Sequence, residues 1–421
     1  MMSLERIDEW LDEVNQIGKT SAAGLYRLAY TKEEQDALDI FRGLCEKEEM
    51  SVREDAAGNL IARREGTADV PAVAIGSHLD TVYAGGQYDG TLGVLAGLEV
   101  IHRLNEKNIQ TTHPVEVIVF RAEESSRFGT ATIGSKLMSG KADPAKLASL
   151  KDKDGITFPE AVEQAGFSFE QLTKAKRPQT DIKTFMELHI EQGPVLENKQ
   201  RSVGIVTGIA APLRLRVLVE GKASHSGTTS MDMRKDALTG ASELILELES
   251  AARNEKDNHT VATVGSIEAS PGAMNVIPGQ CRFDVDIRST DTASRERVYE
   301  RFVQAAGHIE KTRGLSTQMQ TLAEETPVPL SSQVQDCLKE VCSNLNLTPV
   351  FMPSGAGHDV MNMAQKWPSG LLFVPSVNGL SHHPDEFTAL THMVEAVDVL
   401  EQAVRTEADE GRPKKQVEVR S

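Results

Sequence analysis

Three pieces of one segment decide the fold of this chain: "AVAIGSHLD" at residues 72–80, "LGVLAGLEVIHRLNEK" at residues 92–107 and "VEVIVFRAEE" at residues 115–124. The first and third pieces are short apolar runs of the kind found in buried strands, and the second has apolar residues at helical spacing. A strand, a helix and a second strand in this order form a βαβ unit, which predicts a mainly parallel sheet. We therefore expect an α/β fold.

The rest of the chain repeats this pattern and then departs from it. Apolar runs followed by polar loops recur at residues 184–193, 348–359 and 370–384. Residues 212–328 instead contain about four strands of alternating polarity and two helical segments, which is typical of a small α+β layer. We therefore predict a discontinuous domain of residues 1–211 and 329–421, with residues 212–328 inserted as a second domain.

The composition excludes several classes of function. The 421 residues carry 45 Lys and Arg against 62 Asp and Glu, a formal charge of -17, which opposes binding to nucleic acid or to an anionic membrane. No stretch approaches the roughly 20 apolar residues that cross a bilayer, and the N-terminus lacks the apolar core of a signal peptide. The four cysteines lack zinc or redox spacing. We expect a cytoplasmic protein whose locally basic C-terminus, residues 411–421, is a frayed end.

Two adjacent acids, Glu123 and Glu124, end the second strand of the βαβ unit. Neighbouring side chains of a strand point to opposite faces, and adjacent carboxylates repel each other unless a cation or a shared proton compensates. One carboxylate could bind a metal ion while the other takes a proton from an attacking water. The chain has no Ser or Cys nucleophile motif and no Gly-rich nucleotide motif, so metal-assisted hydrolysis is favoured over a solvated acidic turn.

Further candidate ligands follow other strands, at the edge of the sheet where α/β proteins form their sites. Read from the residues alone, His78 and Asp89 are metal ligands, and Asp80 is the acid that holds the His78 ring. The alternative is a polar loop in which Asp89 caps a helix. His189 and His382 enlarge the set enough for two ions if Asp89 bridges them.

Seven motifs together carry a family resemblance. They are GSHLDTV, YDGTLGVLAGLE, EESSRFG, ELHIEQGPVLE, SHSGTT, GAGHD and SHHPDEF. With these motifs the chain resembles, over nearly its whole length, the hydantoinase/carbamoylase branch of the dinuclear metallopeptidase superfamily. That branch includes N-carbamoyl-L-amino acid hydrolases and allantoate amidohydrolases. Each motif alone is weak, but the set is highly specific.

The resemblance implies a centre of two divalent metal ions, zinc or alternatively manganese, cobalt or nickel. The implied ligands are His78 and His189 for one ion, Glu124 and His382 for the other, and Asp89 for both. Glu123 would be the general base. The resemblance also implies a cis peptide bond between Asp89 and Gly90, a conformation that costs about 3–4 kcal/mol for a residue other than proline.

The resemblance also implies a set of substrate-binding residues. They are Gln192, His225, Asn275, Arg288 and Gly357. Arg288 would clamp a carboxylate with two parallel donors, and His225 would stabilise the developing oxyanion. From the residues alone, the alternatives are that Arg288 pairs with Asp284 or Asp286 and that His225 is an ordinary loop residue. Three of the five lie in the inserted domain, which in relatives forms the dimer. We therefore expect a homodimer in which this domain closes and completes the partner's site.

The implied reaction is hydrolysis of the ureido group of an N-carbamoyl-L-amino acid to the L-amino acid, CO2 and ammonia. Allantoate hydrolysis is the alternative within the branch: we expect a proline after Ser-Arg-Phe in allantoate-type members, and this chain has Gly129 there. Aminoacylase or peptidase action is a further alternative, as is a non-catalytic homologue that only binds metal. The retained base and ligands oppose the non-catalytic alternative.

Overall fold

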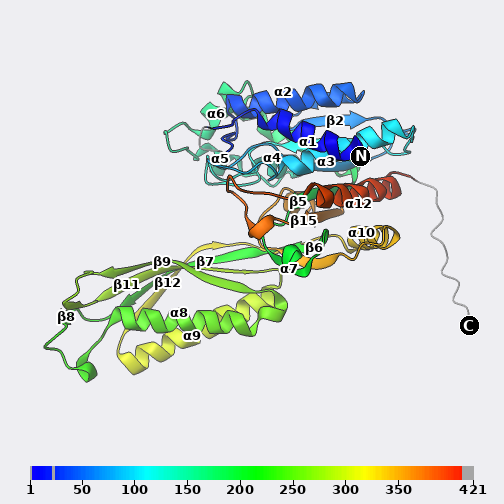
Figure 1. Ribbon diagram of the computed structural model, residues 1–421. Helices are drawn as coiled ribbons and strands as arrows, with labels where there is room; N and C mark the ends of the chain where they lie inside the picture. Colours follow the sequence, from blue (N-terminus) through cyan, green and yellow to red (C-terminus); the bar gives the residue numbers. More distant parts are fainter. Residues whose placement is uncertain (1, 21–23, 410–421) are drawn as a thin grey trace, which may run out of the picture. The chain divides into compact units, whose positions relative to one another are not determined.

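The computed structural model describes residues 2–20 and 24–409 (Figure 1). It divides into two compact units, here called unit 1 (Met1–Thr207 and Leu330–Ser421) and unit 2 (Gly208–Pro329). The predicted insertion, residues 212–328, falls within unit 2. The basic segment 411–421 lies outside the described residues. None of the helices in the two described ranges is long and apolar enough to cross a membrane.

Unit 1 is built around a nine-stranded sheet whose middle is parallel. Four strands lie side by side in the order β4 (Val115–Phe120), β3 (Ala72–His78), β5 (Ile182–Ile190) and β15 (Ser369–Val374). These strands are almost wholly buried, as expected for a parallel sheet that is covered on both faces. The predicted βαβ unit and the α/β class are confirmed.

Short strands at both edges complete the sheet. On one side β2 and β1 add in antiparallel orientation, and on the other side β6 does; β14 pairs with β6, and β13 pairs with the last two residues of β6, which like β13 belong to unit 2. Their bounds are Ser51–Glu54 (β1), Leu60–Arg64 (β2), Gly204–Ile209 (β6), Val328–Pro329 (β13) and Val350–Ser354 (β14). The predicted strand at residues 348–359 is therefore β14, which lies outside the parallel run.

Helices cover both faces of this sheet. The longer ones are α1 (Met2–Asn15), α2 (Lys32–Lys47), α3 (Thr91–Glu106), α10 (Ser332–Asn344) and α12 (Leu390–Ala408). The shorter ones are α4 (Ile133–Ser139), α5 (Pro144–Ala148), α6 (Phe158–Gln164), α7 (Val195–Lys199) and α11 (Val360–Met363), with 3-10 turns η1 (Phe169–Ala175), η2 (Gln179–Asp181) and η5 (Val377–Gly379).

Strand β5 shows how the two faces of the sheet are covered. Glu187 and Leu188 are neighbours on β5, so they point to opposite faces. Leu188 joins the core cluster that includes α3, whereas Glu187 accepts a hydrogen bond from the backbone N–H of Val360 on α11 (2.9 Å).

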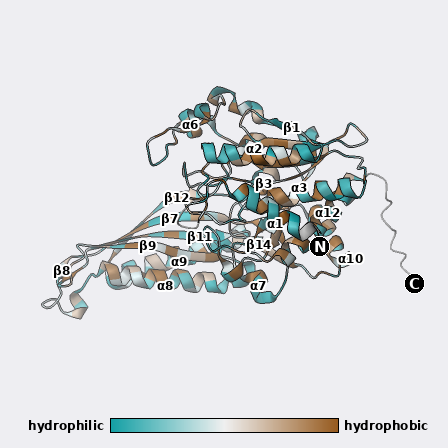
Figure 2. Ribbon diagram, turned by 45° about the horizontal axis from the view of Figure 1, so that its top comes forward, coloured by the Kyte–Doolittle hydropathy of each residue, from teal (hydrophilic) through white to brown (hydrophobic). Residues whose placement is uncertain are grey.

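Unit 2 is a four-stranded antiparallel sheet with two helices on one face (Figure 1). The strand order is β12 (Ser316–Glu324), β7 (Ala211–Glu220), β11 (Gln280–Ser289) and β9 (Val261–Ser270), and the helices are α8 (Ala237–Asn254) and α9 (Thr292–Arg313). The smaller elements are β8 (Ser224–His225), β10 (Val276–Ile277), η3 (Met231–Met233) and η4 (Lys256–Asn258). Alternate residues of β7 and β11, such as Val217 and Phe283, are buried with the helices, along which hydrophobic and hydrophilic residues alternate (Figure 2). This arrangement matches the predicted layer of four strands and two helices.

Candidate metal centre

The parallel strands bring the candidate residues to one edge of the sheet in unit 1. His78 is the last residue of β3 and pairs in register with Phe120, the last residue of β4, three residues before Glu123. His189 lies one residue before the end of β5, on the other side of β3. Since parallel strands end at the same edge, residues that are far apart in the sequence meet there.

Two groups of side chains meet at this edge and share Asp89. In the first group, Asp89 Oδ1 lies 3.4 Å from His78 Nε2 and 3.1 Å from His189 Nε2. In the second group, His382 Nε2 lies 3.4 Å from Asp89 Oδ2 and 3.2 Å from Glu124 Oε1. The structure thus brings together all five predicted ligands, and Asp89 presents one oxygen to each group.

The geometry of both groups fits metal ions. A tetrahedral site with metal–ligand bonds of about 2.0–2.1 Å holds its ligand atoms about 3.3–3.4 Å apart, close to the separations seen here. Imidazole and carboxylate donors suit zinc and also manganese, cobalt and nickel. In each group, three possible ligand atoms lie within 4.8 Å of one another. The donor set therefore fits a two-ion centre.

Backbone carbonyls orient the two buried imidazoles. His78 Nδ1 donates to the backbone oxygen of Asp80 (2.9 Å), and His189 Nδ1 donates to that of Ile190 (2.9 Å). A carbonyl oxygen only accepts, so each ring carries a proton on Nδ1 and turns Nε2 toward Asp89, and in the neutral ring Nε2 is the atom that can bind a metal ion. The prediction that the Asp80 carboxylate holds the His78 ring needs correction, because that carboxylate lies 3.6 Å away and the carbonyl makes the bond.

The Asp80 carboxylate instead holds the two adjacent acids. Its Oδ1 accepts the backbone N–H of Glu123 (3.1 Å) and its Oδ2 that of Glu124 (2.9 Å). The chain has left the strand at this point, since Ala122 adopts the left-handed conformation with φ +53°. The rule that neighbouring side chains face opposite ways therefore no longer applies. Both carboxyl groups are buried at the centre, and Glu123 Oε2 lies 3.7 Å from His78 Nε2.

Burial and charge shift the acid–base properties of the centre. Burial raises the pKa of Glu123 well above its ordinary value, and Glu124 and Asp359 raise it further, although His78 lowers it. Burial alone would lower the pKa of His78, but the carboxylates of Glu123, Asp89 and Asp80 together hold it well above its ordinary value. The negative charge of this buried cluster attracts cations, and Glu123 is suited to accept a proton.

The peptide bond between Asp89 and Gly90 is trans, so the prediction of a cis bond is wrong. The one cis bond among the described residues joins Ser270 and Pro271. A cis bond without proline costs about 3–4 kcal/mol, and the turn is made here without it. Gly90 adopts φ +66°, and its N–H donates to His189 Nε2 (3.3 Å), so the loop turns back toward the first group.

Three side chains fix Asp89, and sequence analysis assigned this task to none of them. Gln192 Nε2 and Ser381 Oγ both donate to Asp89 Oδ2 (2.8 Å each). Glu386 Oε1 accepts the backbone N–H groups of Tyr88 (2.9 Å) and Asp89 (3.0 Å). Gln192 was predicted to bind substrate, and in the structure its side chain donates a hydrogen bond to Asp89. Ser381 and Glu386 belong to the motif SHHPDEF, so this motif was the feature of the sequence from which their role could have been predicted.

A further buried polar cluster lies behind the first group. Glu187 accepts hydrogen bonds from Ser77 Oγ (3.0 Å) and from the backbone of α11, and the ring of His358 meets that of His189 edge-on at 4.5 Å. Burial lowers the pKa of His358 well below its ordinary value and raises that of Asp359 to about 7. Gly357, a predicted substrate residue, precedes this pair in the loop between β14 and α11. The motif GAGHD was noted in the sequence, but no role was assigned to its His or Asp.

The other predicted substrate residues belong to unit 2. His225 is exposed on β8, Asn275 precedes β10, and Arg288 lies on β11. Arg288 pairs with Asp286 through Nε (3.1 Å) and Nη2 (3.0 Å), as in the alternative interpretation of the sequence. Unit 2 by itself does not bring these residues together with the ligands, so their part in binding substrate stays a prediction.

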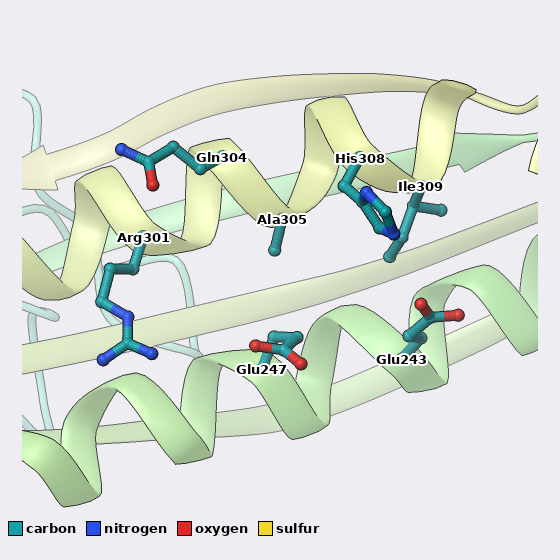
Figure 3. Close-up of a pocket in the computed structure, with 7 residues that line it drawn as sticks. All are labelled: Glu243, Glu247, Arg301, Gln304, Ala305, His308 and Ile309. Atoms are coloured by element: carbon teal, nitrogen blue, oxygen red, sulfur yellow. The ribbon is translucent and has the colours of Figure 1, made fainter. Parts of the chain in front are cut away.

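Unit 2 also has a groove of about 370 Å³ between α8 and α9 (Figure 3). Glu243 and Glu247 of α8 line it on one side, and Arg301 and His308 of α9 on the other. In the part of the chain that the structure describes, every group of side chains that could hold a metal ion lies in unit 1. This groove is therefore not part of the candidate centre.

Comparisons with known proteins agree with this geometry. A family model described as Peptidase family M20/M25/M40 matches residues 72–406. An N-carbamoyl-L-amino acid amidohydrolase of Geobacillus stearothermophilus is 40% identical over 401 residues, which cover 95% of this chain and 97% of that protein. An allantoate amidohydrolase of Escherichia coli (strain K12) is 34% identical over 397 residues, which cover 94% of this chain and 96% of that protein. The crystal structure of a hydantoinase/carbamoylase family amidase from Burkholderia multivorans matches with a TM-score of 0.91 at 32% identity, covering 97% of this chain and 98% of that chain.

These similarities extend over both units and confirm the predicted resemblance to the hydantoinase/carbamoylase branch. The matched family consists of metal-dependent hydrolases of amide bonds, which agrees with the two ligand groups and the buried carboxylate beside them. The chain therefore belongs to Peptidase family M20/M25/M40.

Proposed function

We propose that this enzyme hydrolyses the ureido C–N bond of N-carbamoyl-L-amino acids and releases the L-amino acid, CO2 and ammonia. The observation that carries the proposal is the pair of ligand groups that share Asp89, with the buried carboxylate of Glu123 beside them. The similar amidohydrolase of Geobacillus stearothermophilus supports the choice of substrate.

The roles of the residues in unit 1 follow from their positions. Two divalent ions, held by the two groups, would polarise the ureido carbonyl and lower the pKa of a water molecule. Glu123 takes the proton of the attacking water and then gives it to the leaving nitrogen. Its raised pKa suits both steps, because the carboxyl group must hold the proton between them. Gln192 and Gly357 would contact the bound substrate.

Residues of unit 2 would complete substrate binding. His225 would donate a hydrogen bond to the oxyanion that develops on the ureido carbonyl. Arg288 and Asn275 would bind the carboxylate and the ureido group, and Arg288 would exchange its contact with Asp286 for the substrate carboxylate. In this proposal unit 2 closes on the substrate, and the same residues can serve the partner subunit's site.

We also infer that the enzyme is a homodimer that associates through unit 2. Strand β9 is an outer strand of the four-stranded sheet, so one of the two edges of β9 has no strand partner within unit 2. Both faces of this strand are largely exposed, and Val261 and Ile267 are 56% and 47% exposed. A long edge strand with few charges is a surface on which a second copy can pair. Measurement of the molar mass in solution tests this inference, and a monomer at all concentrations would contradict it.

Allantoate is the alternative substrate, because an allantoate amidohydrolase is also among the similar proteins. The loop after the two acids favours the carbamoyl substrate. Gly129 has φ +68°, which proline cannot adopt, so the proline that we expect in allantoate-type members requires another loop conformation. Side-by-side turnover of N-carbamoyl-L-methionine and allantoate decides between the two, and faster cleavage of allantoate would reverse the assignment.

Two variants of the adjacent acids test the proposed chemistry. Glu123→Gln keeps the shape of the side chain and removes the base, so metal content should persist while ammonia release falls by about 100-fold or more. Glu124→Gln removes a ligand, so metal content should fall together with activity. Unchanged ammonia release by the first variant would remove Glu123 from the mechanism. Release of a free amino acid without ammonia would instead indicate aminoacylase or peptidase action.

A further inference from the structure

One hydrogen bond fixes where the proton of the neutral His225 ring lies. The backbone N–H of Gly227 donates to His225 Nδ1 (3.1 Å). A backbone N–H cannot accept a hydrogen bond, so Nδ1 must be the acceptor and carries no proton in this arrangement. The neutral ring then holds its proton on Nε2. His225 is exposed, and no hydrogen bond within the described residues is recorded for its Nε2, so the Nε2–H is available as a hydrogen-bond donor.

The segment that follows His225, here called the His225 loop (residues 225–235), owes its shape to Arg234. The Arg234 side chain donates from Nη2 to the backbone oxygen of Ser226 (2.6 Å) and from Nε to that of Thr229 (3.1 Å). The backbone N–H of Thr229 in turn donates to the oxygen of His225 (3.2 Å). One guanidinium therefore ties both sides of the turn that presents the Gly227 N–H to the ring.

The outer half of the His225 loop is a short 3-10 turn, in which the N–H of Met233 donates to the oxygen of Ser230 (3.1 Å). Met231 and Met233 are 77% and 73% exposed, so no apolar core anchors its outer half. Its two ends are anchored, because the N–H of Ser226 donates to the oxygen of Asn275 (3.0 Å) and the oxygen of Lys235 accepts from the N–H of Lys222 (2.8 Å). Arg234 lies immediately before the second anchor. Its guanidinium is thus attached to a fixed point of the chain and reaches across the loop.

We propose that Arg234 is a positioning residue: by clamping residues 226–229 it keeps the Gly227 N–H on His225 Nδ1 and so selects the tautomer in which Nε2–H is the donor. The tautomer matters for the reaction because a donor, and not a lone pair, stabilises an oxyanion. This catalytic consequence rests on the proposed function, whereas the tautomer itself does not. Arg234 acts through His225 and has no contact of its own with the reacting atoms in this proposal.

The tautomer is measured directly by nitrogen NMR of protein with labelled histidines, at a pH where imidazole is neutral. The His225 signals are assigned by their loss in His225→Gln. Wild-type protein should show the proton on Nε2. Arg234→Met, which keeps an unbranched side chain but removes the donors, should show a mixture of the two tautomers. Arg234→Lys, which can still reach one carbonyl, should lie between. A proton on Nδ1 in the wild-type protein, or an unchanged tautomer in Arg234→Met, would overturn the proposal.

Kinetics give the second readout. With N-carbamoyl-L-methionine, Arg234→Met should lower kcat by about tenfold or more while KM changes little, because a misplaced donor weakens binding of the transition state more than of the ground state. Arg253→Met is the matched control, since Arg253 is an exposed arginine of α8 that pairs with Glu249. It should leave kcat and the tautomer unchanged. A loss of kcat in Arg234→Met with the wild-type tautomer retained would reject the positioning role.

The two readouts separate this proposal from the proposed function. If the wild-type enzyme does not cleave N-carbamoyl-L-amino acids, the proposed function fails, but the NMR comparison of Arg234→Met with wild type still decides the tautomer. If cleavage is observed and the tautomer is independent of Arg234, the proposed function stands and the positioning role fails. Unfolding curves of all variants, measured in parallel, identify any variant that is not folded.

Discussion

The neighbouring acids Glu123 and Glu124 reach one site because a single residue before them leaves the strand. Ala122 has φ +53°, and nothing about an alanine in the sequence signals such a conformation, since glycine and asparagine are the usual residues there. The chemical roles of the two acids could be predicted from residue type and resemblance. The backbone device that lets them act together could not.

Asp80 is the second part of that device, because its carboxylate accepts the backbone N–H groups of both acids. We predict that Asp80→Asn lowers kcat and the affinity for metal by about 10–100-fold each, since one accepting oxygen becomes an amide donor that faces an N–H. Activity and the metal retained after dialysis measure the effect.

Asp143→Asn is the control for this experiment. Asp143 also accepts two backbone N–H groups, but at the start of the exposed helix α5. This variant should change neither metal content nor activity. Full activity and full metal content in Asp80→Asn would show that the bonds to the acids are not needed at the centre.

Gly129 carries a second prediction at this scale. An added Cβ would meet no atom within 4 Å, so the only cost of Gly129→Ala is its left-handed backbone, φ +68°. We expect the free energy of unfolding to fall by about 1 kcal/mol, with metal content unchanged. Gly129→Pro should cost more, because proline fixes φ near -65° and removes the N–H that donates to Ser125 (2.7 Å).

The comparison of these two variants uses denaturant unfolding and turnover of both ureido substrates. Gly155→Ala is the control, since Gly155 has φ +85° and also has open space around it. It should show the same loss of stability and unchanged turnover. If Gly129→Pro has wild-type stability and turnover, the loop does not depend on this backbone angle, and Gly129 does not distinguish the two substrates.

At the scale of elements, apolar periodicity predicted the parts of unit 1 that are buried on both sides. Strands β3 and β4 and helix α3 were recognised because continuous apolar runs and helical spacing are strong signals. The edge strand β1 and its neighbour β2 were missed: β1 has four residues that are partly or fully exposed, and β2, although almost wholly buried, has only five residues, of which two are arginines. Strand β14 was recognised as a strand, but its apolar run did not show that it pairs at the edge with β6.

Helix α3 also carries a buried charge that holds other parts of unit 1 in place. Glu99 is fully buried, accepts two hydrogen bonds from Arg6 of α1 (2.7 Å each) and one from Arg103 of its own helix (2.8 Å). Arg103 in turn contacts Glu401 of α12. We predict that Glu99→Ala lowers the free energy of unfolding by about 3 kcal/mol, because it removes the buried carboxylate that Arg6 and Arg103 share, while Arg103 keeps its ion pairs with Asp398 and Glu401 of α12.

Denaturant unfolding measures this effect against a control on the same helix. Glu106→Ala removes an exposed acid at the end of α3, and its effect should stay within about 0.5 kcal/mol. Equal effects of the two substitutions would mean that the buried ion pairs contribute no more than a surface charge. In that case the ion pairs of Glu99 with Arg6 and Arg103 do not contribute to holding α1, α3 and α12 together.

At the scale of the whole molecule, the sequence indicated an interrupted domain, and the structure gives two units with a boundary at residues 208 and 329. The insertion was visible because its strands alternate in polarity, as a sheet with one covered face requires. The position of unit 2 residues such as His225 relative to the metal ligands depends on contacts across a long stretch of chain. No local pattern in the sequence specifies such contacts.

The division into units makes one prediction about the metal. All five candidate ligands lie in unit 1, and they join its two sequence segments, since Asp89 and Glu386 are in contact although they are 297 residues apart. Ions that bind the folded unit stabilise it, by about 2.7 kcal/mol per site at a free concentration of 100 times Kd. Chelation should therefore destabilise unit 1 and leave unit 2 unaffected.

Two optical probes distinguish the units in the intact protein. Both tryptophans, Trp10 and Trp367, lie in unit 1, so tryptophan fluorescence reports on that unit, whereas circular dichroism reports on the helices of both. On addition of a chelator, the transition seen by fluorescence should move to lower temperature and return when zinc or manganese is restored. A part of the circular dichroism signal, from α8 and α9, should keep its midpoint. A shift of the whole circular dichroism transition would instead mean that the two units unfold as one, and an unmoved fluorescence transition would contradict the assignment of the ligands to unit 1.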